Sequence, residues 1–146
     1  MLRGWFKDNP QIDGQAVYKE LRYLRAVGMD FGIRKALPKS QGEPTLYAFR
    51  KHFGELELAH KAKAHVDESL PYYHFYMDRL LRYEKVMPEI KDGTSLALKI
   101  GKVFTTNCGL DDNFRIMTMV TLELVSMQKY TKEIVVKMEE DYKPVP

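Results

Sequence analysis

The strongest constraint on the fold lies in the C-terminal part of the chain, where apolar residues recur at alternating spacings of three and four. The positions are Met117, Val120, Leu124, Met127, Thr131, Ile134 and Met138. This spacing is close to the ~3.6 residues of one α-helical turn, so these side chains share one side of a helix that ends near Glu140. At ~1.5 Å per residue the helix would be about 40 Å long, which is more than a compact small bundle requires. We therefore expect its C-terminal end to project and to pack on another chain.

The same periodicity predicts four further helices, and no segment alternates convincingly as a strand does. The predicted helices are one at 14–27, a second that begins at Pro44, a third that begins near Ser69 and ends before Pro88, and a fourth at 95–106. We interpret Gly28 as the stop of the first helix, which makes residues 29–43 a long connection. The fold class is therefore all-α, a bundle of about five helices with a long C-terminal helix.

The chain of 146 residues is of a size typical of one domain. We predict a single helical domain over residues 1–146, with residues 1–12 as an N-terminal arm and 141–146 as an extended tail. Cys108 is the only cysteine, so an intrachain disulfide is impossible and a reducing compartment is favoured. No apolar run approaches the ~18 residues of a membrane span, and the N-terminus lacks the features of a secretory signal. We expect a cytoplasmic protein that does not enter membranes.

A metal site is one interpretation of the segment "GELELAHKAKAH", in which Glu57 and His60 are three residues apart. On a helical wheel both fall within an apolar stripe, as Glu84 does in the following helix. Helical two-metal bundles use two Glu-x-x-His pairs, and this chain has only one. The favoured alternative is that Glu57, His60 and Glu84 only hydrogen-bond at the edge of the core. We expect no cofactor.

Nucleic acid is a second candidate partner, because the N-terminal half is basic. Residues 1–65 hold 12 of the 23 Lys and Arg but 7 of the 20 Asp and Glu. Cations interleaved with tyrosines can hold a phosphate backbone and stack on bases. The candidate residues are Lys19, Arg22, Arg25, Arg34, Lys35 and Lys39. The alternative is a solvated helix face, since the net charge is only +3.

Protein contact is the interpretation that the sequence favours most. Nine Tyr, seven Phe and eight Met are many for this length, and some lie away from the main apolar stripes. Aromatic residues and Met are enriched at interfaces. The predicted contact residues are Trp5, Phe6, Phe75, Met127, Tyr130, Ile134 and Met138. Trp5 and Phe6 have an equally weighted alternative, in which the N-terminal arm folds back on the domain's own core.

These observations predict a non-enzymatic helical protein-interaction module: an adaptor, an inhibitor or a structural subunit of a larger assembly. Its partner would be another protein or a second copy, as in a homodimer through the C-terminal helix. The alternatives are a nucleic-acid-associated helical protein and a metal-binding helical bundle. No phosphate-binding glycine loop, nucleophile elbow or paired C-x-x-C occurs in the sequence.

Overall fold

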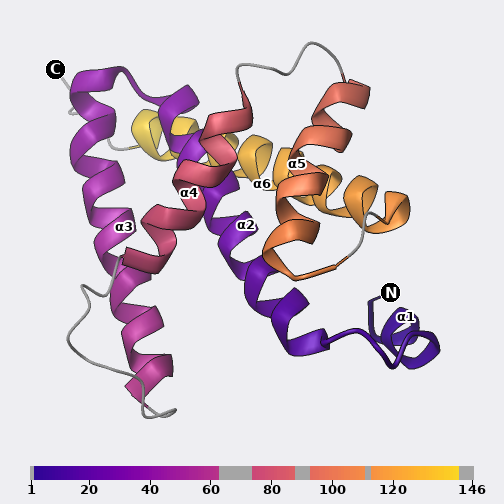
Figure 1. Cartoon of the computed structure of the whole chain (residues 1–146). Coiled ribbons are helices and arrows are strands. Elements are labelled where there is room, and N and C mark those ends of the chain that lie inside the picture. The colour runs from indigo at the N-terminus through magenta and orange to yellow at the C-terminus, as the bar shows by residue number, and fades with distance from the viewer. Residues whose placement is uncertain (1, 63–73, 88–92, 111–112, 142–146) are drawn as a thin grey trace, which may run out of the picture.

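The computed structural model describes residues 2–62, 74–87, 93–110 and 113–141, and these residues form six helices and no strand (Figure 1). The all-α prediction is therefore confirmed for the described part of the chain. In chain order the helices are α1 Leu2–Asp8, α2 Gly14–Ala36, α3 Lys39–Ala62, α4 His74–Val86, α5 Gly93–Asn107 and α6 Phe114–Asp141. None of the helices described is long and apolar enough to cross a membrane.

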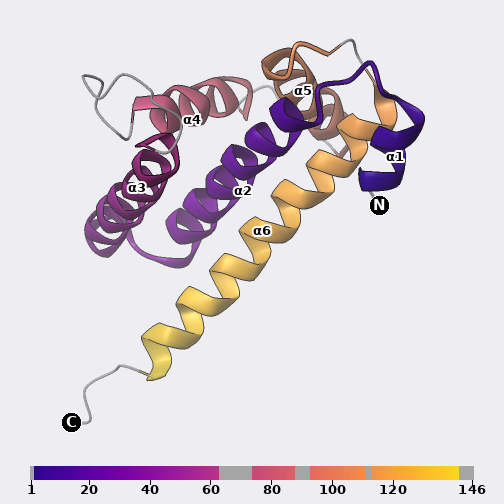
Figure 2. The same cartoon turned by 90° about the horizontal axis from the view of Figure 1, so that it is seen from below.

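Helix α2 is the centre of the bundle and packs on α6 along most of its length (Figure 2). The two helices run in the same direction, since Arg25 pairs with Glu123 and Gly32 lies against Gln128 and Thr131. Helices α3, α4 and α5 also contact α2, and α5 packs on α6. The main core gathers buried side chains from α2, α4, α5 and α6, among them Leu24, Tyr76, Leu80, Phe104 and Leu124.

The predicted helix stop at Gly28 is wrong, because α2 continues through Gly28 and Gly32 to Ala36. Both glycines lie where the backbones of α2 and α6 approach closely. A Cβ atom at Gly28 would lie 2.8 Å from the Cβ of Met127, and one at Gly32 would lie 2.7 Å from the carbonyl oxygen of Gln128. These glycines therefore serve helix packing, and residues 29–36 belong to the helix.

The predicted start of the second helix at Pro44 is also wrong, because α3 begins at Lys39 and contains Pro44 in its interior. The carbonyl of Pro38 accepts hydrogen bonds from the amides of Gln41 and Gly42 and so starts the first turn. Pro44 removes one internal hydrogen bond but does not end the helix. The connection between α2 and α3 is therefore only residues 37–38.

Helices α4, α5 and α6 lie where the periodicity predicts them. Gly109 ends α5 in the left-handed conformation with φ +68°, and Leu110 donates back to the carbonyl of Thr105. Asn113 directly precedes Phe114, the first residue of α6. The amide of Ile116 donates to Oδ1 of Asn113, so Asn113 is the N-cap.

The N-terminal arm contains the short helix α1, and Phe6 folds back toward α2. Its ring lies 5.4 Å from that of Tyr18 in a tilted arrangement, and it also faces Gly14. This packing is what the alternative for Phe6 describes, and the contact role of Phe6 stays a prediction. The side chain of Trp5 and the start of the third predicted helix, near Ser69, lie outside the described residues, as do residues 142–146 of the tail.

Candidate functional site

The predicted metal site is only partly described. Glu84 lies in α4, and its carboxylate forms an ion pair with the guanidinium of Arg34. The side chains of Glu57 and His60 lie outside the described residues. Among the side chains that are described, no three His, Cys, Asp or Glu residues gather as metal ligands would. Glu84 thus has a structural partner, Arg34, which the sequence did not predict for it.

A fully buried carboxylate, Asp30, is the centre of a polar cluster that joins α2, α3 and α4. The Arg50 guanidinium approaches it with Nε 2.7 Å from Oδ2 and a second nitrogen 3.1 Å from Oδ1. Arg34 Nε lies 2.8 Å from Oδ1, one turn further along α2. The Tyr76 hydroxyl donates to Oδ2 at 3.0 Å. Two cations and a hydroxyl thus offset the cost of burying one carboxylate.

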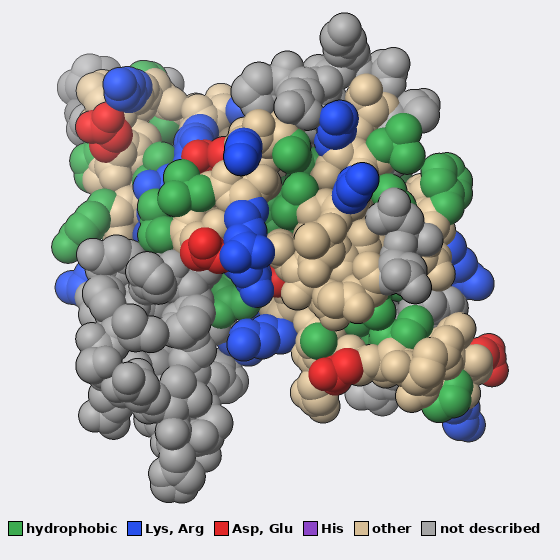
Figure 3. Space-filling model, in the orientation of Figure 1, with side chains coloured by type: hydrophobic (Ala, Val, Ile, Leu, Met, Phe, Trp, Pro, Cys, Tyr) green, Lys and Arg blue, Asp and Glu red, His purple; other side chains and the backbone are tan. Residues whose placement is uncertain are grey.

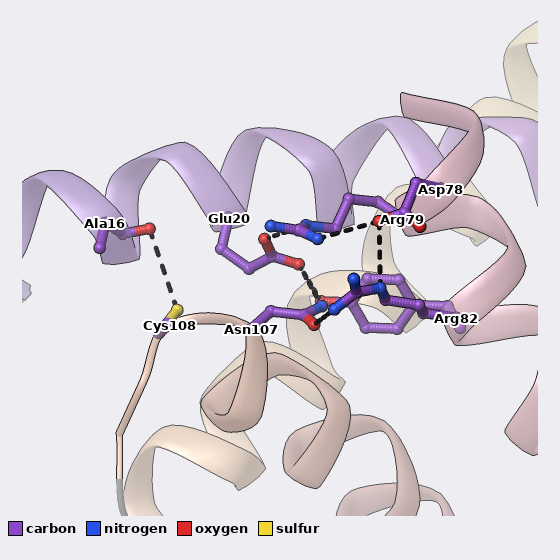
Figure 4. Close-up of polar contacts among 8 residues, drawn as sticks. Ala16, Glu20, Asp78, Arg79, Arg82, Asn107 and Cys108 are labelled. Carbon is purple, nitrogen blue, oxygen red and sulfur yellow. Dashed lines mark hydrogen bonds and ion pairs between the residues drawn. The ribbon is translucent and has the colours of Figure 1, made fainter. Parts of the chain in front are cut away.

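A second buried carboxylate, Glu20, joins α2 to α4 and α5 (Figure 4). Arg79 Nε lies 2.8 Å from Oε2, and Oε1 accepts hydrogen bonds from the Tyr83 hydroxyl at 2.9 Å and from the Asn107 amide at 2.8 Å. The Asn107 carbonyl oxygen in turn accepts from Arg82 at 3.0 Å. This cluster therefore fixes three helices through one acid.

The two tyrosines and the cysteine near these acids are held in their neutral forms. Burial, with the nearby carboxylate as a second cause, raises the pKa of Tyr76 and of Tyr83 well above the ordinary value, so both hydroxyls remain donors. Burial, followed by the charge of Glu20, raises the pKa of Cys108 to about 12. A thiol with this pKa is a poor nucleophile at neutral pH. The two clusters are therefore better suited to joining helices than to nucleophilic catalysis.

Sequence reasoning missed both clusters. Glu20 and Asp30 interrupt the apolar positions of α2, and Asp30 lay in the segment interpreted as a loop. The available signal was the spacing of Tyr76, Arg79 and Tyr83 in α4, which places a cation between two core tyrosines. A buried acid is the natural partner of such a set.

The six predicted nucleic-acid-binding cations are all exposed, but two of them are engaged in ion pairs. Arg25 Nε lies 2.6 Å from Glu123, and Arg34 pairs with both Asp30 and Glu84. A depression of about 480 Å³ next to Arg34 is lined by Arg34, Arg50, Lys39, Glu43 and Glu84 among others. Its charges nearly cancel, so it selects neither anions nor cations.

The C-terminal half of α6 carries the largest number of predicted contact residues. Met127 is half-buried against Gly28, whereas Tyr130, Ile134 and Met138 are 60%, 40% and 52% exposed. We name these three exposed side chains the α6 apolar face. Ile134 and Met138 continue the side of α6 on which Met117, Val120 and Leu124 are buried, and Tyr130 lies to one side of it. The remaining predicted contact residue, Phe75, has its side chain outside the described residues.

Comparison with protein-family models, with curated proteins and with solved structures found no match to this chain. Function must therefore be inferred from the geometry of the chain itself.

Proposed function

We propose that the protein is a non-enzymatic helical interaction module that contacts its partner with the C-terminal half of α6. The observation that carries this proposal is the continuity of one apolar seam from the core into solvent. The seam is buried at Met117, Val120 and Leu124 and exposed at Ile134 and Met138. An apolar helix side that leaves its own bundle is typical of a surface that a partner covers.

The relative lengths of α2 and α6 support the same proposal. The contacts of Gly28 with Met127 and of Gly32 with Thr131 set the register of the pair. Continued at this offset, Ala36 at the end of α2 lies level with Val135, which still packs on the cluster of Ile33, Leu37 and Leu46. The part of α6 from residue 136 to Asp141 extends past α2 (Figure 2).

The residue types of the exposed segment also suit an interface. Tyr130 presents a rigid ring with a polar tip, and Met138 is flexible enough to fit an irregular surface. Both residue types are enriched at protein interfaces, while charged residues are depleted at interface centres. The buried acids Glu20 and Asp30 are engaged in joining helices, so α6 is the better candidate for contact with other molecules.

The test replaces Ile134 and Met138 together by Glu, which places two charges on the α6 apolar face. The matched control replaces Leu122 and Val125 by Glu, since both are exposed side chains on another side of the same helix. Native mass spectrometry and light scattering would measure the assembly of each purified variant, alone and with the proteins that co-purify with the wild type. We expect loss of association for the first variant only. Equal association of wild type and both variants, all folded by circular dichroism, would contradict the proposal.

A further inference from the structure

A basic groove of about 470 Å³ lies between α4 and α5. Figure 3 shows Lys and Arg side chains over these two helices on the face turned to the viewer. The groove lining contains no acidic residue among those described. It is made mainly of four cations around two valines, namely Arg82, Lys85, Lys99, Lys102, Val86 and Val103. A groove of this composition attracts a segment that combines anionic groups with an apolar side chain.

Three cations of the groove, Arg82, Lys85 and Lys102, are only weakly neutralised by described carboxylates of their own chain. Arg82 Nε lies 3.0 Å from Asp78, but Asp78 also pairs with Arg79. Lys85 and Lys102 are exposed, and neither forms an ion pair with a described carboxylate. The groove thus keeps a net positive charge.

The end of α6 has the complementary composition. Glu139, Glu140 and Asp141 are exposed and follow the exposed Met138 directly. The last turn of α6 has no basic residue. The C-terminus of a helix carries the negative end of its macrodipole, so acidic residues there are electrostatically unfavourable until cations approach. The basic groove supplies such cations, and its valines suit Met138.

The end of α6 cannot reach the groove of its own chain. Helix α5 packs on the N-terminal part of α6, where Gly101 faces Met117. Met138 lies 21 residues further on, which corresponds to about 30 Å along a straight helix. In Figure 2 the C-terminal end of α6 points away from α4 and α5. The two complementary surfaces can therefore meet only between molecules.

We propose that the groove between α4 and α5 binds the acidic C-terminal end of α6 from a second copy of this chain. This inference rests on the proposed function of α6 in protein contact and names both the partner and its receiving surface. The contact is head-to-tail, because the two surfaces differ. Head-to-tail contacts form a ring if the rotation closes and an open chain if it does not. Because the contact is ionic, it weakens as salt rises.

The groove favours a protein helix over nucleic acid. Among the described residues that line it, none is an aromatic on which a base could stack, and the two valines are apolar. Nucleic acid is nevertheless an outcome that the test must separate, since phosphate groups are also anionic.

The test uses two variants of the full chain. The groove variant is Lys85→Glu with Lys102→Glu, and the end variant is Glu139→Gln with Glu140→Gln and Asp141→Asn. Native mass spectrometry and light scattering at ~50 mM salt measure the mass of each protein. We expect the wild type to form a dimer or a larger species and each variant alone to be a monomer. An equimolar mixture of the two variants keeps one intact groove and one intact end, so it should form a heterodimer and nothing larger.

Two controls change charges elsewhere, at exposed positions. Lys19→Glu with Lys35→Glu matches the groove variant, and Glu43→Gln with Glu55→Gln is a charge-neutralising control for the end variant. Both controls should associate as the wild type does. Circular dichroism would establish that every variant is folded.

Three results would overturn the inference, and they bear differently on the proposed function. If the wild type assembles and only Ile134→Glu with Met138→Glu prevents it, the α6 face is an interface but the groove is not. If the wild type is monomeric at every concentration, self-association is wrong and only a different protein could be the partner of α6. In the third result, the wild type does not self-associate but binds a labelled single-stranded DNA or RNA, and the groove variant does not bind it. The groove then serves nucleic acid.

Discussion

The close approach of α2 and α6 predicts the sign of the stability change when a glycine of α2 is replaced by alanine. In an exposed or roomy helix interior, replacing Gly by Ala stabilises a protein by up to about 1 kcal/mol, because Ala has the higher helix propensity. At Gly32 an added Cβ would lie 2.7 Å from the backbone oxygen of Gln128 and 2.8 Å from the Cβ of Thr131. Real Cβ atoms do not approach other atoms this closely, so α6 would have to move.

The expected magnitude follows from two opposing effects. Overpacking a well-packed interface costs about 1–3 kcal/mol, and the upper end applies here because one of the neighbouring atoms is backbone. After the propensity gain of about 1 kcal/mol, Gly32→Ala should lower the free energy of unfolding by about 1–2 kcal/mol. Gly28→Ala should do the same, since its Cβ would meet the Cβ of Met127 at 2.8 Å.

Gly42→Ala is the matched control. Gly42 is also buried and helical, but its Cβ would meet Leu37 at 3.7 Å, an ordinary contact. This variant should be unchanged or more stable by up to about 1 kcal/mol. Urea unfolding followed by circular dichroism measures all three, and a change of 2 kcal/mol corresponds to a midpoint shift of about 1 M. If Gly28→Ala and Gly32→Ala stabilised the protein as Gly42→Ala does, the close packing of α2 on α6 would be refuted.

Three further predictions concern the Glu20 cluster and the neighbouring Cys108. Glu20→Gln should lower the free energy of unfolding by about 3 kcal/mol, because it leaves the partly buried Arg79 without its main counter-charge. Asp78→Asn, at a half-exposed position, should lower it by less than about 1 kcal/mol. Urea unfolding measures both losses, and equal losses would contradict the assigned roles. The Cys108 thiol has a folded pKa of about 12 against 9.0 when unperturbed, so its neutral form is favoured in the folded state. Stability should therefore be unaffected by this thiol below about pH 9 and fall as pH rises toward 12, and Cys108→Ala should reduce this loss. Alkylation of Cys108 near pH 8 should be much slower than in the urea-unfolded chain, and comparable rates would refute its burial.

Much of the fold could be predicted from spacing alone. The apolar repeat of α6 identifies its buried side, and Met117, Val120 and Leu124 from that repeat are all buried. The long C-terminal helix also follows directly from its repeat. Periodicity is informative here because each helix buries only one main side.

The course of α2 could not be predicted in the same way, because glycine has two opposite roles in helices. A glycine ends a helix when the chain adopts a positive φ, as at Gly109, and it permits close packing when another helix approaches, as at Gly28. The local sequence is compatible with both roles at Gly28. Only the position of α6, which is about one hundred residues away in the sequence, decides between them.

The polar clusters escaped prediction for a related reason. A carboxylate in an apolar repeat normally marks the exposed side of a helix. Asp30 and Glu20 are exceptions because their partners come from distant segments, such as Arg50 in α3 and Tyr83 in α4. The exposure of Tyr130, Ile134 and Met138 agrees with the contact role assigned to them, and the role itself stays a prediction.

The length of α6 is the feature that folding of a single chain does not account for. Residues up to Val135 are held by α2, whose glycines and apolar side chains cover one side of α6. The following residues to Asp141 must still be fixed in a helix, which costs about 1–2 kcal/mol of backbone entropy per residue. Within the described chain they gain little apolar contact in return, and the acidic last turn stands at the unfavourable end of the helix dipole. A partner that supplies cations and an apolar surface would offset both costs, and the groove between α4 and α5 of a second copy has this composition.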